Sequence, residues 1–167
     1  MSPTATITWR YHEFDIFNAT SWVFELEDIA QALSHQCRFN GHVSFYSVAE
    51  HSVWVSQILE NQGHLANTQL LGLLHDGAEA YLGDIPGPWK RYVKVDNRPI
   101  AELEKAIELR MFERFGIEYT DEQWEDVKRA DHLAYLDEAS CRPAPGKGWD
   151  PEKAKSQFIK RYHDLKR

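Results

Sequence analysis

Apolar residues recur every three or four positions through most of the chain, which is the spacing of one face of an α-helix. The pattern predicts six helices, over residues 27–39, 44–63, 68–83, 98–115, 120–139 and 151–162. No run of alternating polar and apolar residues competes with these helices after residue 26. A length of 167 residues suits one hydrophobic core. We therefore expect an all-α bundle of about six helices, in a single domain that spans residues 1–167.

Local signals mark the ends of the predicted helices. Four of the predicted helices begin at a residue whose side chain can accept a hydrogen bond from a free backbone N–H: Ser47, Thr68, Thr120 and Asp150. Thr120 forms a capping box with Gln123, and Pro151 follows Asp150 at a first helical position. Glycines are the expected stops, at Gly41, Gly63, Gly83 and Gly116. Residues 84–90 and 142–149 contain prolines and should form loops.

The first 26 residues follow no helical period. Aromatic side chains are scattered among polar ones, at Trp9, Tyr11, Phe14, Phe17, Trp22 and Phe24. Such a segment can bury aromatic surface without forming a helix of its own. We expect residues 1–26 to be an extended arm that lies on the helical domain, with little secondary structure.

Composition narrows the possible partners. A formal charge of -7 without a cluster of Lys and Arg argues against binding a long nucleic acid, although a small anion needs only a few well-placed cations. The two cysteines, Cys37 and Cys141, form no CxxC motif and are too few for a disulfide scaffold. No signal peptide or apolar run of membrane length is evident. We expect a soluble, cytoplasmic protein with no membrane partner.

Four polar residues interrupt the apolar pattern of the predicted helices. His51, His75 and Asp131 lie on stripes that should face the core, and Asp76 follows His75 directly. A buried carboxylate needs a compensating cation, which an arginine, a lysine or a metal could supply. Two imidazoles and two carboxylates are a suitable ligand set for a divalent first-row ion. Each histidine taken alone would more often be a hydrogen-bonded core residue, but together the four predict a metal site.

The same residues carry a family resemblance. The segments CRFNGH, YSVAEHS, HDGAE and GDIPGPWK, followed by ADHLAYLDEA, resemble the HD superfamily of metal-dependent phosphohydrolases. Within it, the chain is most similar to bacterial 5′-deoxynucleotidases and small phage dATP triphosphohydrolases, from about Asp28 to Ala139. The resemblance implies an HD-type helical bundle and a metal held by His51, His75, Asp76 and Asp131.

The resemblance also implies two catalytic residues. Glu79 lies three positions after Asp76 and four after His75, so it shares their helical face, and in similar enzymes this position orients or deprotonates the attacking water. Asp84 matches an acidic residue that assists the attack or the leaving oxygen. The alternative for Asp84 is a turn residue before Pro86.

Four further residues are candidate substrate contacts by resemblance. Arg38 matches a phosphate-binding arginine, a role that suits its planar fork of donors; otherwise it is a cation near a helix C-terminus. Lys90 and Lys128 match phosphate contacts of the triphosphate enzymes, or are ordinary exposed lysines. Phe39 occupies a position near the base or sugar, or packs in the core.

The implied activity is attack of water on the phosphoryl group next to the sugar of a deoxynucleotide, a dNMP or a dNTP. The expected cofactor is one divalent ion, Co, Mn, Zn, Ni or Fe, with a second ion, Mg, left open beside the substrate phosphates. The resemblance further implies a homo-oligomer, between a dimer and a hexamer, in a bacterial or, for a phage protein, host cytoplasm. Two alternatives remain: a non-catalytic regulatory or interaction domain stabilised by metal, and a di-iron HD oxygenase. The oxygenase and the related two-metal phosphodiesterases add histidines between the His-Asp pair and the last Asp, where this chain has none.

Overall fold

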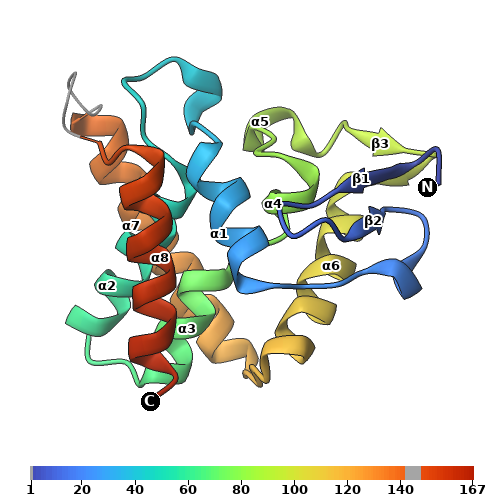
Figure 1. Ribbon diagram of the computed structural model, residues 1–167. Coiled ribbons are helices and arrows are strands. Elements are labelled where there is room, and N and C mark those ends of the chain that lie inside the picture. The colour runs from blue at the N-terminus through green and yellow to red at the C-terminus, as the bar shows by residue number, and fades with distance from the viewer. Residues whose placement is uncertain (1, 142–147) are drawn as a thin grey trace.

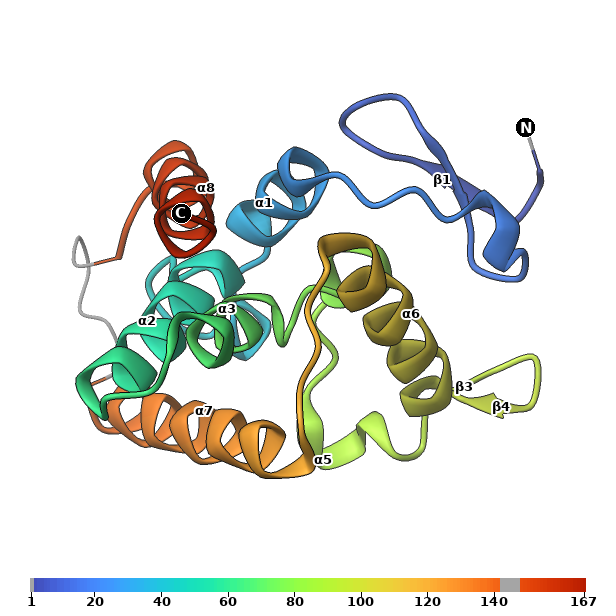
Figure 2. The same cartoon turned by 90° about the horizontal axis from the view of Figure 1, so that it is seen from below.

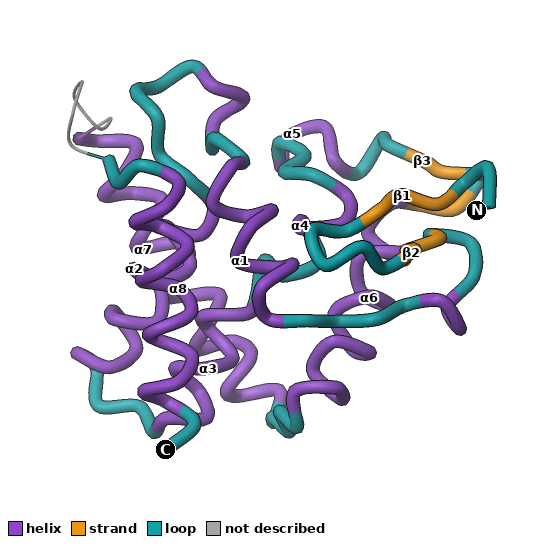
Figure 3. The backbone as a smooth tube through the Cα atoms, viewed as in Figure 1, coloured by secondary structure: helices purple, strands orange, loops and turns teal. Residues whose placement is uncertain are grey.

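The computed structural model describes residues 2–141 and 148–167, so most of the predicted loop 142–149 lies outside the described residues. The helices are α1 (Leu26–His35), α2 (Val48–Asn61), α3 (Ala66–Leu74), α4 (Glu79–Leu82), α5 (Gly87–Lys90), α6 (Ile100–Phe115), α7 (Asp121–Cys141) and α8 (Pro151–Leu165) (Figure 1). The strands are very short: β1 (Ala5–Ile7), β2 (Glu13–Asp15), β3 (Lys94–Val95) and β4 (Arg98–Pro99). They form two antiparallel pairs at one end of the molecule, and helices make up the rest (Figure 3). The predicted all-α class is confirmed.

Helices α2 and α3 form the centre of the bundle. They pack against each other, with α7 on one side and α8 and α1 on the other (Figure 2). Val55 and Leu59 of α2 lie against Gly72 of α3, and both side chains are fully buried, as are Leu71 and Leu74. Because both central helices are covered on several sides, polar groups on their inner faces must find partners within the protein.

Helix α6 lies to one side of this bundle and packs against the segment that follows α3 (Figure 2). A Cβ at Gly77 would lie 2.5 Å from the Met111 sulfur, so a larger residue here would require the Met111 side chain to shift. The left-handed Gly116 ends α6 as predicted.

Three of the four predicted N-terminal caps are confirmed. The Ser47 hydroxyl accepts a hydrogen bond from the Glu50 N–H, and the Asp150 carboxylate accepts one from Lys153 N–H. Thr120 and Gln123 exchange both bonds of the capping box. Thr68 is not a cap, because α3 begins two residues earlier and the Thr68 hydroxyl instead accepts a bond from the Gln123 amide.

Three predicted helices are shorter than expected. The second begins at Val48, after the Ser47 cap, rather than at residue 44. The first ends at His35 rather than residue 39, because the backbone of Cys37 pairs with that of Ser47 in an isolated β-bridge. The third is broken: α3 ends at Leu74, residues 75–78 form turns, and α4 continues from Glu79 until the positive-φ Gly83. The proline-containing segment 84–90 is a loop that includes the single turn α5.

The N-terminal arm packs on the domain, but it contains more regular structure than expected. Strands β1 and β2 pair as an antiparallel hairpin. Phe14 is fully buried and stacks on Trp22 and on Tyr81 of α4, with ring centroids 5.6 and 4.1 Å apart. The buried aromatic cluster therefore attaches the arm to the segment that follows α3.

Candidate metal centre

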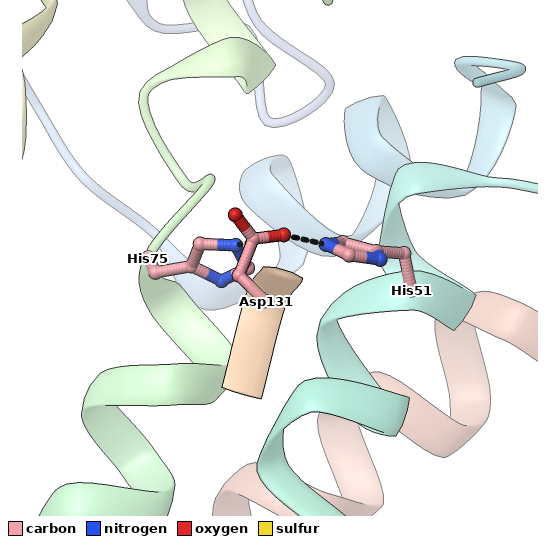
Figure 4. Close-up of side chains that lie close together, drawn as sticks. All are labelled: His51, His75 and Asp131. Atoms are coloured by element: carbon pink, nitrogen blue, oxygen red, sulfur yellow. Dashed lines mark ion pairs between the residues drawn. The ribbon is translucent and has the colours of Figure 1, made fainter. Parts of the chain in front are cut away.

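Three predicted ligands come together from three different helices. His51 lies in the first turn of α2, His75 follows the last residue of α3, and Asp131 lies midway along α7 (Figure 4). One potential ligand atom from each lies within 4.8 Å of the others. The Asp131 carboxylate Oδ1 is 3.0 Å from His51 Nε2 and 3.7 Å from His75 Nε2.

Asp76, the fourth predicted ligand, faces the same point. Its Oδ2 lies 3.2 Å from His75 Nε2 and 3.6 Å from His51 Nε2. Two carboxylates and two ring nitrogens thus converge, an N₂O₂ donor set of the kind found around divalent transition metals. Whether these donors fit a metal depends on which nitrogen of each imidazole is available to bind it.

The hydrogen bonds of the two imidazoles identify that nitrogen. His51 Nδ1 is 2.6 Å from the Glu138 carboxylate, and His75 Nδ1 is 2.8 Å from the Gly72 carbonyl oxygen. Carboxylates and carbonyls only accept, so each Nδ1 carries a proton and Nε2 is the ring nitrogen left for a metal. Both Nε2 atoms are buried without a hydrogen-bond partner among the described residues. Two unpartnered ring nitrogens beside two carboxylates fit a cation.

The titratable groups of the cluster shift one another's pKa values. Burial opposes ionisation of Asp131, but the neighbouring His51 and His75 rings lower its pKa below the usual range. Burial is likewise outweighed at Asp76, where His75 and His51 lower the pKa to about 2. In turn Asp76 and Asp131 overcome burial and raise the pKa of His75 well above its ordinary value. Both carboxylates are therefore ionised at neutral pH, as metal ligands must be.

The ligand cluster opens into a cavity of about 710 Å³. Seven of the ten predicted site residues line it: Arg38, Phe39, Asp76, Glu79, Asp84, Lys90 and Asp131. His51 and His75 are buried beside it. The side chain of Asp131 is 42% exposed, which corrects the expectation that it faces the core: it faces the cavity.

Glu79 is the most perturbed acid in the cavity. Its side chain is nearly inaccessible, and one carboxylate oxygen has no hydrogen-bond partner among the described residues. Burial, together with the negative charges of Asp76 and Asp84, raises the pKa of Glu79 to about 10. Lys90 opposes this shift from 3.8 Å away. Burial also raises the pKa of Asp84, against the influence of Arg38.

Arg38 and Phe39 lie side by side at the cavity wall. The Arg38 guanidinium is 5.6 Å from the centre of the Phe39 ring, and Nη1 is 3.9 Å from Asp76 Oδ2. Phe39 and Asn40 both have positive φ angles, 56° and 53°, a strained backbone that often marks a binding site. Tyr135 of α7 faces Phe39, with ring centroids 6.1 Å apart.

The two predicted lysines have different surroundings. Lys90 lines the cavity and is paired with Glu104 of α6, a residue that the sequence analysis did not single out. Lys128 is not among the residues that line the cavity. It is exposed on α7 and pairs with Glu125 one turn earlier, so its position does not support the predicted phosphate contact.

Glu138 is a site residue that the sequence analysis missed. It lies seven positions after Asp131, on the same stripe of α7, and only 6% of it is exposed. Its carboxylate accepts hydrogen bonds from His51, Arg38 and Tyr46. Although burial opposes ionisation, His51 and Arg38 lower the pKa of Glu138. The available signal was a second acidic residue at helical spacing on an otherwise apolar face.

Within residues 2–141 and 148–167, none of the helices is both long enough and apolar enough to span a lipid bilayer.

The chain has relatives among known proteins. It is 36% identical to Uncharacterized protein YfdR of Escherichia coli K12 over 118 residues, which cover 70% of this chain and 60% of the relative. It is 38% identical to Uncharacterized protein RCAP_rcc00048 of Rhodobacter capsulatus over 113 residues, which cover 62% of this chain and 54% of the relative. The chain thus spans less than two thirds of the length of either relative. No protein-family model matches it.

Proposed function

We propose that this protein is an HD-type, metal-dependent phosphohydrolase that acts on deoxynucleotides. The observation that carries the proposal is the convergence of two unpartnered imidazole nitrogens and two ionised carboxylates beside a cavity that also contains Arg38. A metal site alone could serve stability, whereas a metal site open to a cavity with an anion-binding side chain suits catalysis. The resemblance of the sequence to HD phosphohydrolases names the reaction.

The ligand set favours one divalent transition metal ion. His51, His75, Asp76 and Asp131 would hold it, and Mn, Fe, Co, Ni or Zn suits imidazole and carboxylate donors. When bound, such an ion supplies a Lewis acid that polarises a phosphoryl oxygen and makes hydroxide available near neutral pH. The cluster of His51, His75 and Asp131 is the only group of three or more candidate ligands found among the described residues, which favours a single ion over the two of a di-iron oxygenase.

Three side chains that line the cavity would bind the phosphate, activate the water and protonate the leaving oxygen. Arg38 is held by Glu138 through Nε and Nη2, which leaves Nη1 toward the cavity to donate to a phosphate oxygen. Glu79 lies close to the ligands, and a bound cation would favour its ionised form, which can orient the attacking water and receive its proton. Asp84 lies further along the same wall, where its carboxyl group can donate a proton to the leaving oxygen of the sugar.

The cavity also has room for the nucleoside part of a substrate. Phe39 and Tyr135 present two aromatic rings on one side, and bases stack readily on such rings. The charged side chains lie close to the metal ligands, so a substrate would bind with its phosphate inward. We infer no preference among the bases.

Turnover measurements test the proposal directly. The purified protein is incubated with each dNMP and dNTP in the presence of Co²⁺, Mn²⁺ or Zn²⁺, and released phosphate and triphosphate are quantified. We expect metal-dependent release that Asp76→Ala abolishes and Lys128→Ala leaves within twofold. Phosphate as the product would identify a nucleotidase, and triphosphate a triphosphohydrolase. A metal-loaded protein inactive on the whole panel would refute the proposal and favour a metal-stabilised interaction domain.

A further inference from the structure

The two carboxylate oxygens of Glu138 contact different partners inside the protein. Its Oε1 accepts hydrogen bonds from His51 Nδ1 at 2.6 Å and from the Tyr46 hydroxyl at 2.9 Å. Its Oε2 accepts a hydrogen bond from Arg38 Nε at 3.1 Å and forms an ion pair with Arg38 Nη2, also at 3.1 Å. One carboxylate therefore joins a metal ligand and the arginine of the cavity wall through different oxygens.

The contact with His51 acts on the metal side. A carboxylate that accepts the Nδ1–H of a ligand histidine fixes the rotation of the ring and makes Nε2 a stronger donor. The His51 ring is completely buried, so water cannot replace this hydrogen bond. Tyr46 donates to the same oxygen and holds the carboxylate in the required orientation.

The contact with Arg38 acts on the substrate side. Arg38 has a long side chain with considerable rotational freedom, and holding Nε and Nη2 removes most of it before any ligand binds. The remaining nitrogen, Nη1, stays on the side of Asp76, 3.9 Å from its Oδ2. An ordinary ion pair between Glu138 and Arg38 would leave the second oxygen free, whereas here that oxygen supports the metal ligand.

We propose that Glu138 is a positioning residue that orients His51 and Arg38 together, and thereby couples the strength of metal binding to the strength of phosphate binding. The proposal rests on the proposed function for the identity of the two ligands. It adds a residue outside the predicted metal, catalytic and substrate contacts. Asp131 and Glu138 both lie on α7, so one rigid helix would carry a metal ligand and the support of another.

Glu138→Gln is the matched substitution. Glutamine keeps the size of the side chain, but it has one oxygen instead of two and cannot accept hydrogen bonds from His51 and Arg38 through separate oxygens. We expect the dissociation constant for Co²⁺, measured by competition with a chelator, to rise 10- to 100-fold. At saturating Co²⁺, the affinity for inorganic phosphate should also fall, by about tenfold. Glu108→Gln removes another buried carboxylate, one that contacts neither His51 nor Arg38, and should leave both constants within threefold of the wild type.

These binding measurements need no turnover, so they separate the two proposals. Wild-type protein that binds Co²⁺ and phosphate but hydrolyses no nucleotide would refute the proposed function alone. Unchanged constants in Glu138→Gln would overturn the role of Glu138, as would a loss of metal affinity without a loss of phosphate affinity, because coupling requires both.

A measurement on the wild type covers the case in which Glu138→Gln does not fold. In the Zn²⁺-loaded protein labelled with ¹⁵N-histidine, long-range ¹H–¹⁵N spectra report which nitrogen of His51 carries the proton. We expect a protonated Nδ1 and a metal-bound Nε2. The opposite assignment would overturn the proposal, because Glu138 could then not orient the ring through Nδ1.

Discussion

Replacing Glu79 with glutamine should make the protein more stable at neutral pH while removing its hydrolytic activity. Glutamine has the shape of a protonated glutamic acid, and the buried Glu79, with a pKa raised to about 10, is protonated at pH 7 in the absence of a metal ion. In the unfolded chain the ordinary pKa is 4.5. At pH 7, folding therefore requires Glu79 to bind a proton about 2.5 pH units above its pKa in the unfolded chain. At 1.36 kcal/mol per unit, this costs about 3 kcal/mol.

The direction of the pH dependence follows from proton binding. Between pH 4.5 and pH 10 the folded state holds a proton on Glu79 that the unfolded state has lost, so the free energy of unfolding falls as the pH rises. Glu79→Gln has no such proton to bind. In EDTA, the stability advantage of the variant should grow from near zero at pH 5 to about 3 kcal/mol, as an upper value, at pH 7.

Urea unfolding at pH 5, 6, 7 and 8 in EDTA measures this difference. Saturating Mn²⁺ should reduce it, because a cation beside Glu79 favours the ionised carboxylate. Glu113→Gln removes a carboxylate from the protein surface and serves as the control. If Glu79→Gln is no more stable than the wild type at pH 7 in EDTA, or shows the same pH dependence, burial of the Glu79 carboxyl group does not lower the free energy of unfolding as we expect.

Three further predictions concern packing and substrate contacts. Gly148→Ala should lower the free energy of unfolding by about 1–3 kcal/mol in urea, because its Cβ would lie 2.1 Å from the Phe45 carbonyl oxygen; unchanged stability would contradict this close approach. Phe14→Ala should cost about 3–5 kcal/mol and expose the arm to limited proteolysis, which an intact arm would disprove. Lys128→Ala should change KM less than twofold, since Lys128 pairs with Glu125; a large rise in KM would restore it to the substrate site.

The helices could be predicted because their signals are local. Apolar spacing and caps such as Ser47, Asp150 and the pair Thr120 and Gln123 depend on residues within one or two turns. The prediction failed where distant contacts decide the backbone. The third helix breaks after Leu74, close to the point where Gly77 packs against Met111 of α6, and local apolar spacing does not encode that contact.

The candidate site was predictable to a similar extent. His51, His75, Asp76 and Asp131 were identified as polar residues in apolar surroundings, and they lie together in the structure. Lys128 was predicted as a phosphate contact by resemblance to the triphosphate enzymes. Three residues fall about 60° short of a full helical turn, so Lys128 does not lie directly in line with Asp131, and it is exposed.

By itself, the sequence determined the helical class, most helix ends and the residue types available for a metal. These properties arise from hydrogen bonds and hydrophobic spacing between near neighbours. Only the tertiary structure decided which nitrogen of His51 is free, which face of α7 meets the cavity and what supports Arg38. The free nitrogen of His51 and the support of Arg38 depend on Glu138, which lies 87 residues from His51 and 100 from Arg38 in the chain. Contacts over such separations are set by how the helices pack, and a local pattern does not encode them.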